Sequence, residues 1–380
     1  MIGSPCMIRP GELPFSTRVV VTRVTTITTT MMKNTVTLAF TLMTGFALQG
    51  RVTAAETDEP PATRSFEFIY TTTISGIAAG QGPVHIFLPL PIENAQQSLN
   101  AWSITSFTGE GRNALVGSVE TESEYGNRYW HAVLPEAYGT PIEIEARYEV
   151  TRRTGLAAPA GAARALSDRD AADLAKYLTA NSRVVVDHPV LEPILAEIAS
   201  QSIATRPGDN VAVARSIYDW VVDNITYKKV GTGWGNGDTF WACSERYGNC
   251  TDFHSLFISL ARTKDIPARF DMGFPIPEDR PRGNISGYHC WVNFYSAETG
   301  WFPVDASEAF NHPERRDLYF GGRPLDRIHF TTGRDLRLGR WHQDRPLNYF
   351  IYPYVEVDGK RFEESIESHF SYQDLTSPAG

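Results

Sequence analysis

The sequence predicts an α+β protein, in which a β-sandwich precedes a second domain built from helices and antiparallel strands. Three observations lead to this fold class. Short β-rich runs lie between Phe66 and Val150 and are separated by Gly, Pro and Asn. Apolar residues then recur at helical spacing as far as Ile225, and strand-like runs return from Ile266 onward. We therefore expect a β-sandwich domain at 66–155 and a second domain, with a helical lead-in, at 160–375.

The first domain is predicted from five short β-rich runs. They read FEFIYTTTI, PVHIFLPLP, ALVGSVETE, RYWHAVL and IEIEARYEV. Nothing in them gathers the residue types that catalysis needs, so we interpret this region as a packing or recognition domain.

Three helices are predicted at the start of the second domain. Ser167 and Asp170 have capping-box spacing at the start of SDRDAADLAKYL. Pro189 opens PVLEPILAEIA, and Asp209 is placed to cap DNVAVARSIYDWVVDNI. A loop rich in Gly and Trp follows and ends at Cys250.

The N-terminal segment is typical of an exported protein. Residues 31–55 contain a lysine, a short apolar stretch and then small residues, which is the pattern of a secretory signal peptide. The apolar stretch is too short and interrupted to form a stable membrane span, and a buried helix is the alternative. Residues 1–30 match no domain, so the true start is expected at Met31 or Met32, and 56–65 form a linker. We predict a periplasmic or secreted protein.

The charge balance argues against a nucleic-acid partner. The chain has 35 basic and 44 acidic residues, a formal net charge of −9, and loss of residues 1–55 would make it more acidic. Phosphate contacts need clustered Lys and Arg.

Export would also leave three cysteines, Cys243, Cys250 and Cys290. An odd number in an oxidising compartment means that one thiol stays free or that none is paired. A disulfide between Cys243 and Cys290, with Cys250 free, is one hypothesis.

Cys250 begins a predicted amphipathic helix, CTDFHSLFISLAR, in which the apolar residues fall on one face. The positive end of the helix dipole would lower the thiol pKa at this position. We expect Gly248 and Asn249 to supply a left-handed backbone at a sharp entry to the helix. A buried structural cysteine is the alternative interpretation of Cys250, and Asp252 is expected to brace the helix.

The segment GYHCWVNFYSAETGWFPVDAS predicts a β-hairpin. If Tyr295 faces Trp301 across the hairpin, then His289 and Asp305 are diagonal neighbours on one face, within side-chain reach. A slip of one residue in the register would separate them. Cys290 should point to the opposite face.

Together these segments resemble the bacterial transglutaminase-like core. The resemblance rests on Gly-Asn-Cys-Thr-Asp before a helix, Asp-Ile-Pro-Ala-Arg at 265–269, His-x-Trp and Trp-x-Pro-x-Asp, and it covers residues 210 to 310. It implies a papain-like α+β fold with the thiol at a helix N-terminus against an antiparallel sheet. It also implies a triad of Cys250 as nucleophile, His289 as base and Asp305 as the residue that orients His289, with no cofactor.

The sequence departs from the commonest pattern of this family at Cys290 and His254, and we expect neither departure to touch the triad. His254, one turn after Cys250, could be an alternative base but is better interpreted as a helix-flank residue. A zinc site built from the cysteines and histidines is disfavoured, because His289 and Cys290 point to opposite faces of a strand.

Aromatic residues near the thiol are candidates for substrate binding. Trp234, Phe240 and Trp241 precede the helix, and Trp291 follows His289 by two residues. Packing in the core is the alternative for the aromatic loop.

The predicted function is acyl transfer from an amide bond, in a protein or peptide substrate, through a thioester. Hydrolysis is preferred over transfer to an amine, because nothing in the sequence demonstrates a tunnel that excludes water. The alternative from another class is a non-catalytic envelope protein that retains the fold for binding.

Overall fold

A computed structural model describes residues 62–109, 113–157, 167–201 and 209–375. All of these residues belong to one compact unit that begins at Glu59. The predicted signal peptide at 31–55, the preceding segment 1–30 and residues 56–61 of the predicted linker lie outside the described residues. The end of the predicted linker is not a linker, because the strand β1 already begins at Thr63.

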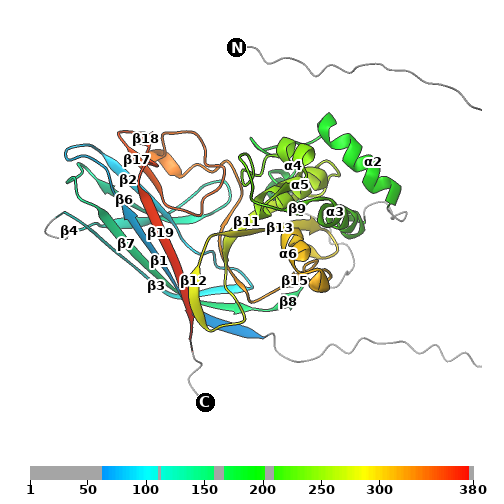
Figure 1. The fold of residues 1–380 in the computed structure, drawn as a ribbon, viewed down its shortest axis with the longest axis horizontal. Coiled ribbons are helices and arrows are strands. Elements are labelled where there is room, and N and C mark those ends of the chain that lie inside the picture. The colour runs from blue at the N-terminus through cyan, green and yellow to red at the C-terminus, as the bar shows by residue number, and fades with distance from the viewer. Residues whose placement is uncertain (1–61, 110–112, 158–166, 202–208, 376–380) are drawn as a thin grey trace, which may run out of the picture. The chain divides into compact units, whose positions relative to one another are not determined.

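The helices lie in the middle of the chain, as predicted (Figure 1). They are α1 (Asp168–Ala175), α2 (Glu192–Gln201), α3 (Asn210–Asn224), α4 (Thr239–Glu245), α5 (Cys250–Arg262) and α6 (Ala306–Asn311), with 3-10 turns η1 (Pro189–Leu191), η2 (Pro313–Arg315) and η3 (Gly339–Trp341). Ser167 caps α1 in a capping box with Asp170, and the Asp209 side chain caps α3. Helix α4 falls inside the segment that the sequence indicated as a loop.

Two large sheets form the β-sandwich. The six-stranded sheet has the order β12-β19-β1-β7-β3-β4, and the five-stranded sheet has the order β18-β17-β2-β6-β5. The strands of the first sheet are β1 (Thr63–Ile74), β3 (Gln97–Thr108), β4 (Asn113–Ala114), β7 (Ile142–Arg153), β12 (Arg282–Ile285) and β19 (Ile366–Asp374). Those of the second sheet are β2 (Val84–Pro89), β5 (Gly117–Thr121), β6 (Arg128–Leu134), β17 (Tyr354–Val357) and β18 (Lys360–Arg361).

Alternation explains why these strands form a sandwich. Along β1 and β7 every second side chain is buried, and these side chains join those of β2 and β6 in one hydrophobic core. The five predicted runs correspond to β1, β2, β5, β6 and β7, whereas the long strand β3 was not predicted. The predicted order of a sandwich followed by an α+β core is confirmed.

The end of the chain contributes strands to the sandwich. β19 pairs with β1 along its whole length, from Ile366 opposite Ile74 to Asp374 opposite Phe66, and β17 pairs with β2. The division into a domain at 66–155 and a domain at 160–375 remains a prediction, and the second segment supplies strands to the sheets of the first.

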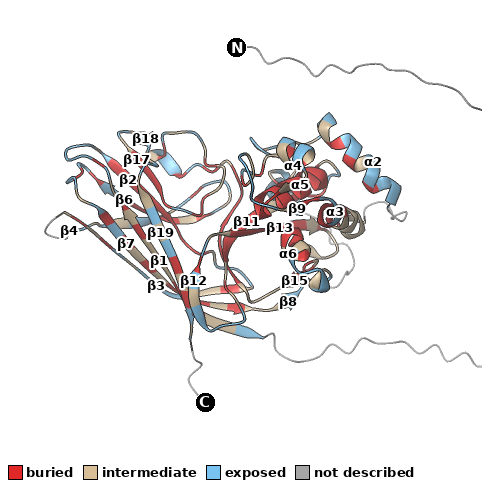
Figure 2. Cartoon of the chain, in the orientation of Figure 1, coloured by how far each residue is buried: buried red, intermediate tan, exposed pale blue. Residues whose placement is uncertain are grey.

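A separate four-stranded antiparallel sheet, β14-β13-β11-β16, carries the functional region. Its strands are β11 (Ala268–Pro275), β13 (His289–Ser296), β14 (Gly300–Val304) and β16 (Arg327–Thr332), and β8 (Gly155–Leu156), β9 (Thr226–Tyr227), β10 (Tyr247–Gly248) and β15 (Gly322–Arg323) form two small ribbons. Helix α5 packs on this sheet, and all its residues are buried (Figure 2). The helix is therefore enclosed on its polar side as well.

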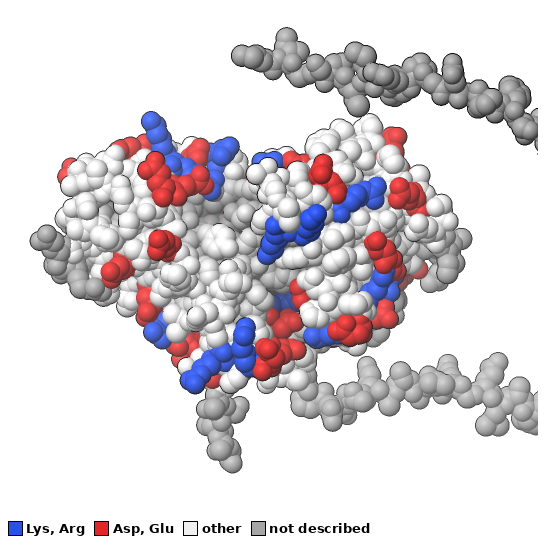
Figure 3. Space-filling model, in the orientation of Figure 1, with Lys and Arg blue, Asp and Glu red and all other residues white. Residues whose placement is uncertain are grey.

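The core sheet is fixed to the sandwich by aromatic packing. The ring of Phe68 on β1 lies 5.1 Å from that of Phe274 on β11 and 5.6 Å from that of Phe330 on β16. Acidic and basic side chains are interspersed on the face drawn in Figure 3. Within the described residues, every helix is too short or too polar to cross a bilayer.

Candidate active site

Helix α5 begins at Cys250, as the sequence predicts. Asn249 is the N-cap, with its side-chain oxygen accepting a hydrogen bond from the Thr251 N–H at 2.9 Å. Asp252 completes a capping box by accepting from the Asn249 N–H at 2.9 Å. Cys250 thus lies at the N-terminal end of a capped helix, where the helix dipole favours a negative charge.

Asp252 braces more than its own helix. Its carboxylate also accepts hydrogen bonds from the backbone N–H groups of Gly235, at 2.7 Å, and Gly237, at 3.0 Å. Burial raises the pKa of Asp252, and the three backbone N–H donors oppose that rise. The loop before α4 is therefore tied to the start of α5, and the predicted bracing role is confirmed.

The expected left-handed backbone before Cys250 is absent. Asn249 has extended dihedral angles, φ −105° and ψ −168°, and Gly248 does not have a positive φ. Glycine is required at 248 because a Cβ there would lie 2.1 Å from an Asp252 carboxylate oxygen. Close approach of the capping carboxylate, and not backbone handedness, explains this residue.

The hairpin has the predicted register, with Tyr295 opposite Trp301. This register brings His289 and Asp305 together, and the Nε2 of His289 lies 2.7 Å from an Asp305 carboxylate oxygen. Both residues are buried. The Nδ1 side of the imidazole is then left for Cys250, to which the His289 side chain is hydrogen-bonded.

Asp305 is held by several donors besides His289. Arg327 on β16 donates from Nη1 to the same carboxylate oxygen at 2.8 Å. The other oxygen accepts from the Ser307 hydroxyl and the Glu308 N–H, each at 3.1 Å, so Asp305 also caps α6. Burial alone would raise the pKa of Asp305, but the charges of His289 and Arg327 hold it well below its usual range.

The pKa values of the thiol and the imidazole are shifted in opposite directions. A hydrogen bond from Cys290 and the neighbouring His289 lower the pKa of Cys250 well below its ordinary value, although burial acts against them. Burial lowers the pKa of His289, but Asp305 and Cys250 outweigh this effect and raise it well above its ordinary value. The two shifts favour a thiolate next to an imidazolium.

Cys290 and His254 both lie against this group, which corrects the expectation that neither touches it. Cys250 is beside the first residues of β13, so it contacts His289 and also Cys290, although strand neighbours point to opposite faces. His254 is fully buried: its Nε2 accepts from the Ala306 N–H at 3.1 Å, and its Nδ1 lies 3.5 Å from the Cys290 sulfur. His254 is therefore no helix-flank residue, because α6 covers this side of α5.

The hydrogen bond from Ala306 also fixes the state of His254. An Nε2 that accepts leaves the proton on Nδ1, which then donates to the Cys290 sulfur. Burial lowers the pKa of His254 to about 4, so this imidazole is neutral at neutral pH.

Cys243, Cys250 and Cys290 are all free thiols, so the hypothesis of a Cys243–Cys290 disulfide is not supported. Cys243 lies on α4, and Cys290 lies against Cys250 instead. No group of three or more His, Cys, Asp or Glu side chains suited to a metal ion occurs in the described parts of the chain.

The three candidate tryptophans lie in different places. Trp234 donates from Nε1 to the Gly231 carbonyl, and Trp241 on α4 donates to the Tyr247 carbonyl, so both bonds stay within the segment that precedes Cys250. Trp291 is buried on the face of the core sheet that lies away from α5, between His289 and His329. A substrate-binding role for these residues remains a prediction.

Two residues near the thiol were not predicted from the sequence. The Tyr288 hydroxyl is hydrogen-bonded to the Thr251 hydroxyl at 2.8 Å and to the Asn249 amide at 3.0 Å, directly beside Cys250. Arg327, which binds Asp305, is 22 positions further along the chain. No local sequence pattern indicates either residue. Tyr288 reaches the thiol because α5 packs against β13, and Arg327 reaches Asp305 because of the order of the strands in the sheet.

Comparison with known proteins agrees with this arrangement. The family model of the transglutaminase-like superfamily matches residues 198–306. An uncharacterized protein of Haemophilus influenzae is 24% identical over 343 residues, which cover 81% of this chain and 89% of that protein. The uncharacterized protein YebA of Bacillus subtilis is 31% identical over 77 residues, 18% of this chain and 10% of that protein.

A solved structure shares the fold. The crystal structure of a protein from Cytophaga hutchinsonii, described as a candidate cysteine protease, superposes with a TM-score of 0.52 at 15% identity. The match covers 84% of this chain and 93% of that one. The fold is thus that of a transglutaminase-like α+β core, and residues 198–306 match the model of the transglutaminase-like superfamily.

Proposed function

We propose that this protein is an exported thiol enzyme that transfers acyl groups from amide bonds of proteins or peptides, in the periplasm or outside the cell. The observation that carries the proposal is the buried chain of contacts from Cys250 through His289 to Asp305. Cys250 is the proposed nucleophile, His289 the acid and base, and Asp305 the residue that orients His289.

The chemistry follows from the proposed thiolate–imidazolium pair. The Cys250 thiolate attacks the amide carbonyl carbon, the C–N bond breaks, and His289 gives its proton to the leaving amine. Water then gives a proton to His289 as its oxygen attacks the thioester. The carbon–sulfur bond breaks, which releases the acid and restores the thiolate.

His289 is a better candidate for the base than His254. Both ring nitrogens of His254 are engaged, one by the Ala306 N–H and the other by Cys290. The low pKa of His254 also makes it a poor proton acceptor at neutral pH.

The test compares hydrolysis with amine transfer. Purified protein is incubated with casein in the presence and absence of a fluorescent amine, and new peptide ends and bound fluorescence are both measured. We expect new ends to exceed fluorescence, and we expect Cys250→Ala to lose both activities while Cys243→Ala keeps them. Equal activity in the Cys250→Ala variant would contradict the proposal and favour a binding protein.

A further inference from the structure

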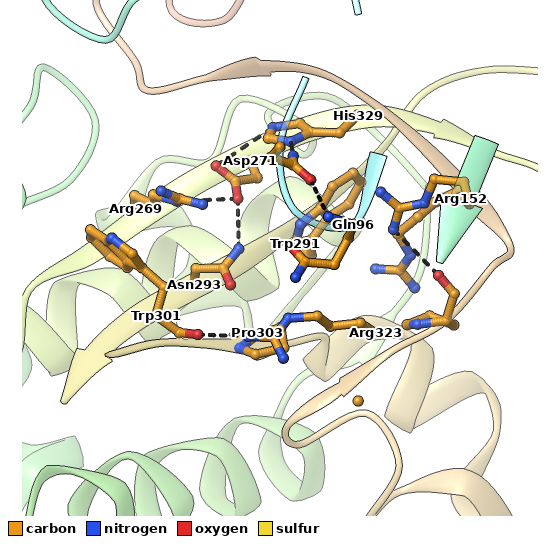
Figure 4. A pocket seen from close by; sticks show the side chains of 14 residues that line it. Gln96, Arg152, Arg269, Asp271, Trp291, Asn293, Trp301, Pro303, Arg323 and His329 are labelled. Atoms are coloured by element: carbon orange, nitrogen blue, oxygen red, sulfur yellow. Dashed lines mark hydrogen bonds and ion pairs between the residues drawn. The ribbon is translucent and has the colours of Figure 1, made fainter. Parts of the chain in front are cut away.

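A polar pocket lies between the β-sandwich and the core sheet (Figure 4). Arg152 on β7 and Gln96 in the loop before β3 line it from the sandwich, and Trp291 and Asn293 on β13 line it from the core sheet. The pocket encloses about 80 Å³. Cys290, next to Trp291 on the strand, contacts His254 of α5, so the pocket is on the sheet face opposite to α5.

The lining of this pocket has a clear excess of positive charge. It contains four arginines and a single aspartate, and these residues are Arg152, Arg269, Arg323, Arg327 and Asp271. Asp271 is already engaged by the Asn293 amide at 2.6 Å, the Thr332 hydroxyl at 2.7 Å and Arg269 at 3.3 Å. Little of its charge is therefore available to the other arginines.

Arg152 is the arginine with the poorest partners. Its side chain is buried, with 5% of the residue exposed, and its Nε has no hydrogen-bond partner among the described residues. The two Nη atoms reach only the Gln97 amide oxygen at 3.4 Å and the Pro324 carbonyl at 3.3 Å. Burial lowers the pKa of Arg152 to about 9. The positive charge of Arg327 also lowers this pKa, and the negative charge of Asp326 opposes the shift.

Arg323 is only half-buried, but its hydrogen bonds also go to neutral groups. It donates to the carbonyls of Leu156 and Trp301, which are neutral groups. Burial and the charge of Arg269 lower its pKa. A charge taken out of water without a counterion is costly, so the buried Arg152 beside the half-buried Arg323 indicates that an anion completes the site.

We propose that this pocket is a binding site for a small oxyanion, a carboxylate or phosphate group, held by Arg152 and Arg323. Arginine presents several N–H donors in a plane that matches such groups. The pocket volume of about 80 Å³ is several times the roughly 10–15 Å³ that one ordered water needs by the same measure, so a small charged group fits. The site goes beyond the proposed thiol chemistry and is tested by binding alone, so one proposal can fail without the other.

The experiment measures binding of sodium phosphate and sodium acetate to the full chain by calorimetry and thermal unfolding, with ionic strength held constant by chloride. We expect saturable binding and a matching rise in melting temperature. Arg152→Met and Arg323→Gln should each weaken binding about tenfold or more, as expected for loss of hydrogen bonds to a charged group. The exposed Arg282→Gln, on β12, should bind as the parent does.

A free ion and a larger ligand are distinguished by further arms. Binding of dialanine is compared with binding of its C-terminal amide. If dialanine binds more tightly than acetate and the amide does not bind, the ligand is a peptide carboxylate. If phosphate binds most tightly of all, the ligand is a phosphate group. The near-ultraviolet circular dichroism spectrum establishes that each variant is folded. Binding that fails to saturate, or that is equal in Arg152→Met, Arg323→Gln and the parent, would overturn the proposal.

Discussion

At the scale of single residues, hydrogen-bond donors of the site surround two groups, the Asp305 carboxylate and the Cys250 sulfur. Asp305 accepts from His289 and Arg327 on one oxygen and from the Ser307 hydroxyl and the Glu308 N–H on the other. Cys290 and His289 lower the pKa of Cys250, which favours its thiolate form. The buried surroundings strengthen each of these interactions, since little water screens them.

The first prediction concerns the pH dependence of thiol labelling. Since the pKa of Cys250 is lowered, the thiolate persists above that value and is lost only as the pH falls through it. An ordinary thiol with a pKa of about 8.5 is only roughly 0.3% ionised at pH 6. We expect the parent to react with iodoacetamide at pH 6 and His289→Ala to react about 100-fold more slowly, with the gap narrowing as the pH rises.

The control for this measurement is His312→Ala, which removes a half-exposed histidine near Glu308 and should leave the labelling rate unchanged. If His254→Ala slows labelling at pH 6 and His289→Ala does not, the base has been assigned to the wrong residue.

The pH dependence of turnover should reflect His289 as well. Because the pKa of His289 is raised, we expect activity to be lost only at high pH, where the imidazolium loses the proton that it gives to the leaving amine.

The second prediction assigns a positioning role to Cys290. Because its hydrogen bond lowers the pKa of Cys250, Cys290→Ala should move the acid limb of the labelling profile to higher pH. Cys290→Ser retains a donor and should restore the profile. A purely structural role would instead lower stability in both variants and leave the midpoint of the acid limb where it is in the parent.

At the scale of elements, the start of α5 is held together with a second segment, the glycine loop before α4. The Asp252 carboxylate collects N–H groups from its own N-cap and from the glycine loop before α4. Gly237, with φ +58°, could not carry a side chain, because a Cβ would lie 2.3 Å from the Ser255 hydroxyl. The loop and the helix therefore fold together.

The third prediction tests this assembly. Asp252→Asn leaves one good acceptor in place of two charged oxygens, so we expect a loss of about 2–4 kcal/mol in the free energy of unfolding, measured by urea denaturation. Asp170→Asn, in the capping box of the more exposed α1, should cost about 1 kcal/mol or less. Equal losses in the two variants would show that the glycine loop adds nothing to the bracing.

At the scale of the whole molecule, the chain closes on itself. β19, the last described strand, lies between β1 and β12, and its Phe370 ring contacts Phe274 of the core sheet at 4.4 Å and Tyr70 of β1 at 4.6 Å. The sandwich and the core sheet therefore share one hydrophobic core. We expect them to unfold in a single transition.

The fourth prediction follows from this shared core. Phe370→Ala should lower the free energy of unfolding by about 3–5 kcal/mol, as expected for removal of a buried aromatic ring. Its neighbour His369 is exposed, and His369→Ala should change stability by less than about 0.5 kcal/mol. Two separate thermal transitions in Phe370→Ala, with only one of them shifted, would contradict a common core.

Local patterns were sufficient for much of the site. Periodicity placed the start of α5 at Cys250, and strand parity with a short turn placed His289 beside Asp305, because both depend on residues close together in the chain. The same parity led to the wrong expectation that Cys290 would not touch the triad. Parity gives the direction of a side chain along one strand, and it does not show which helix end lies beside that strand.

The sequence alone determined that a sandwich precedes an α+β core, and it also determined the helix that carries the thiol and the hairpin that joins His289 to Asp305. The tertiary structure alone decided that β19 completes the first sheet, that His254 is buried, and that Arg327 reaches Asp305. Hydrophobic periodicity and capping are local and can be read along the chain. Pairing and charge contacts across hundreds of residues depend on how the sheets pack, which no local pattern encodes.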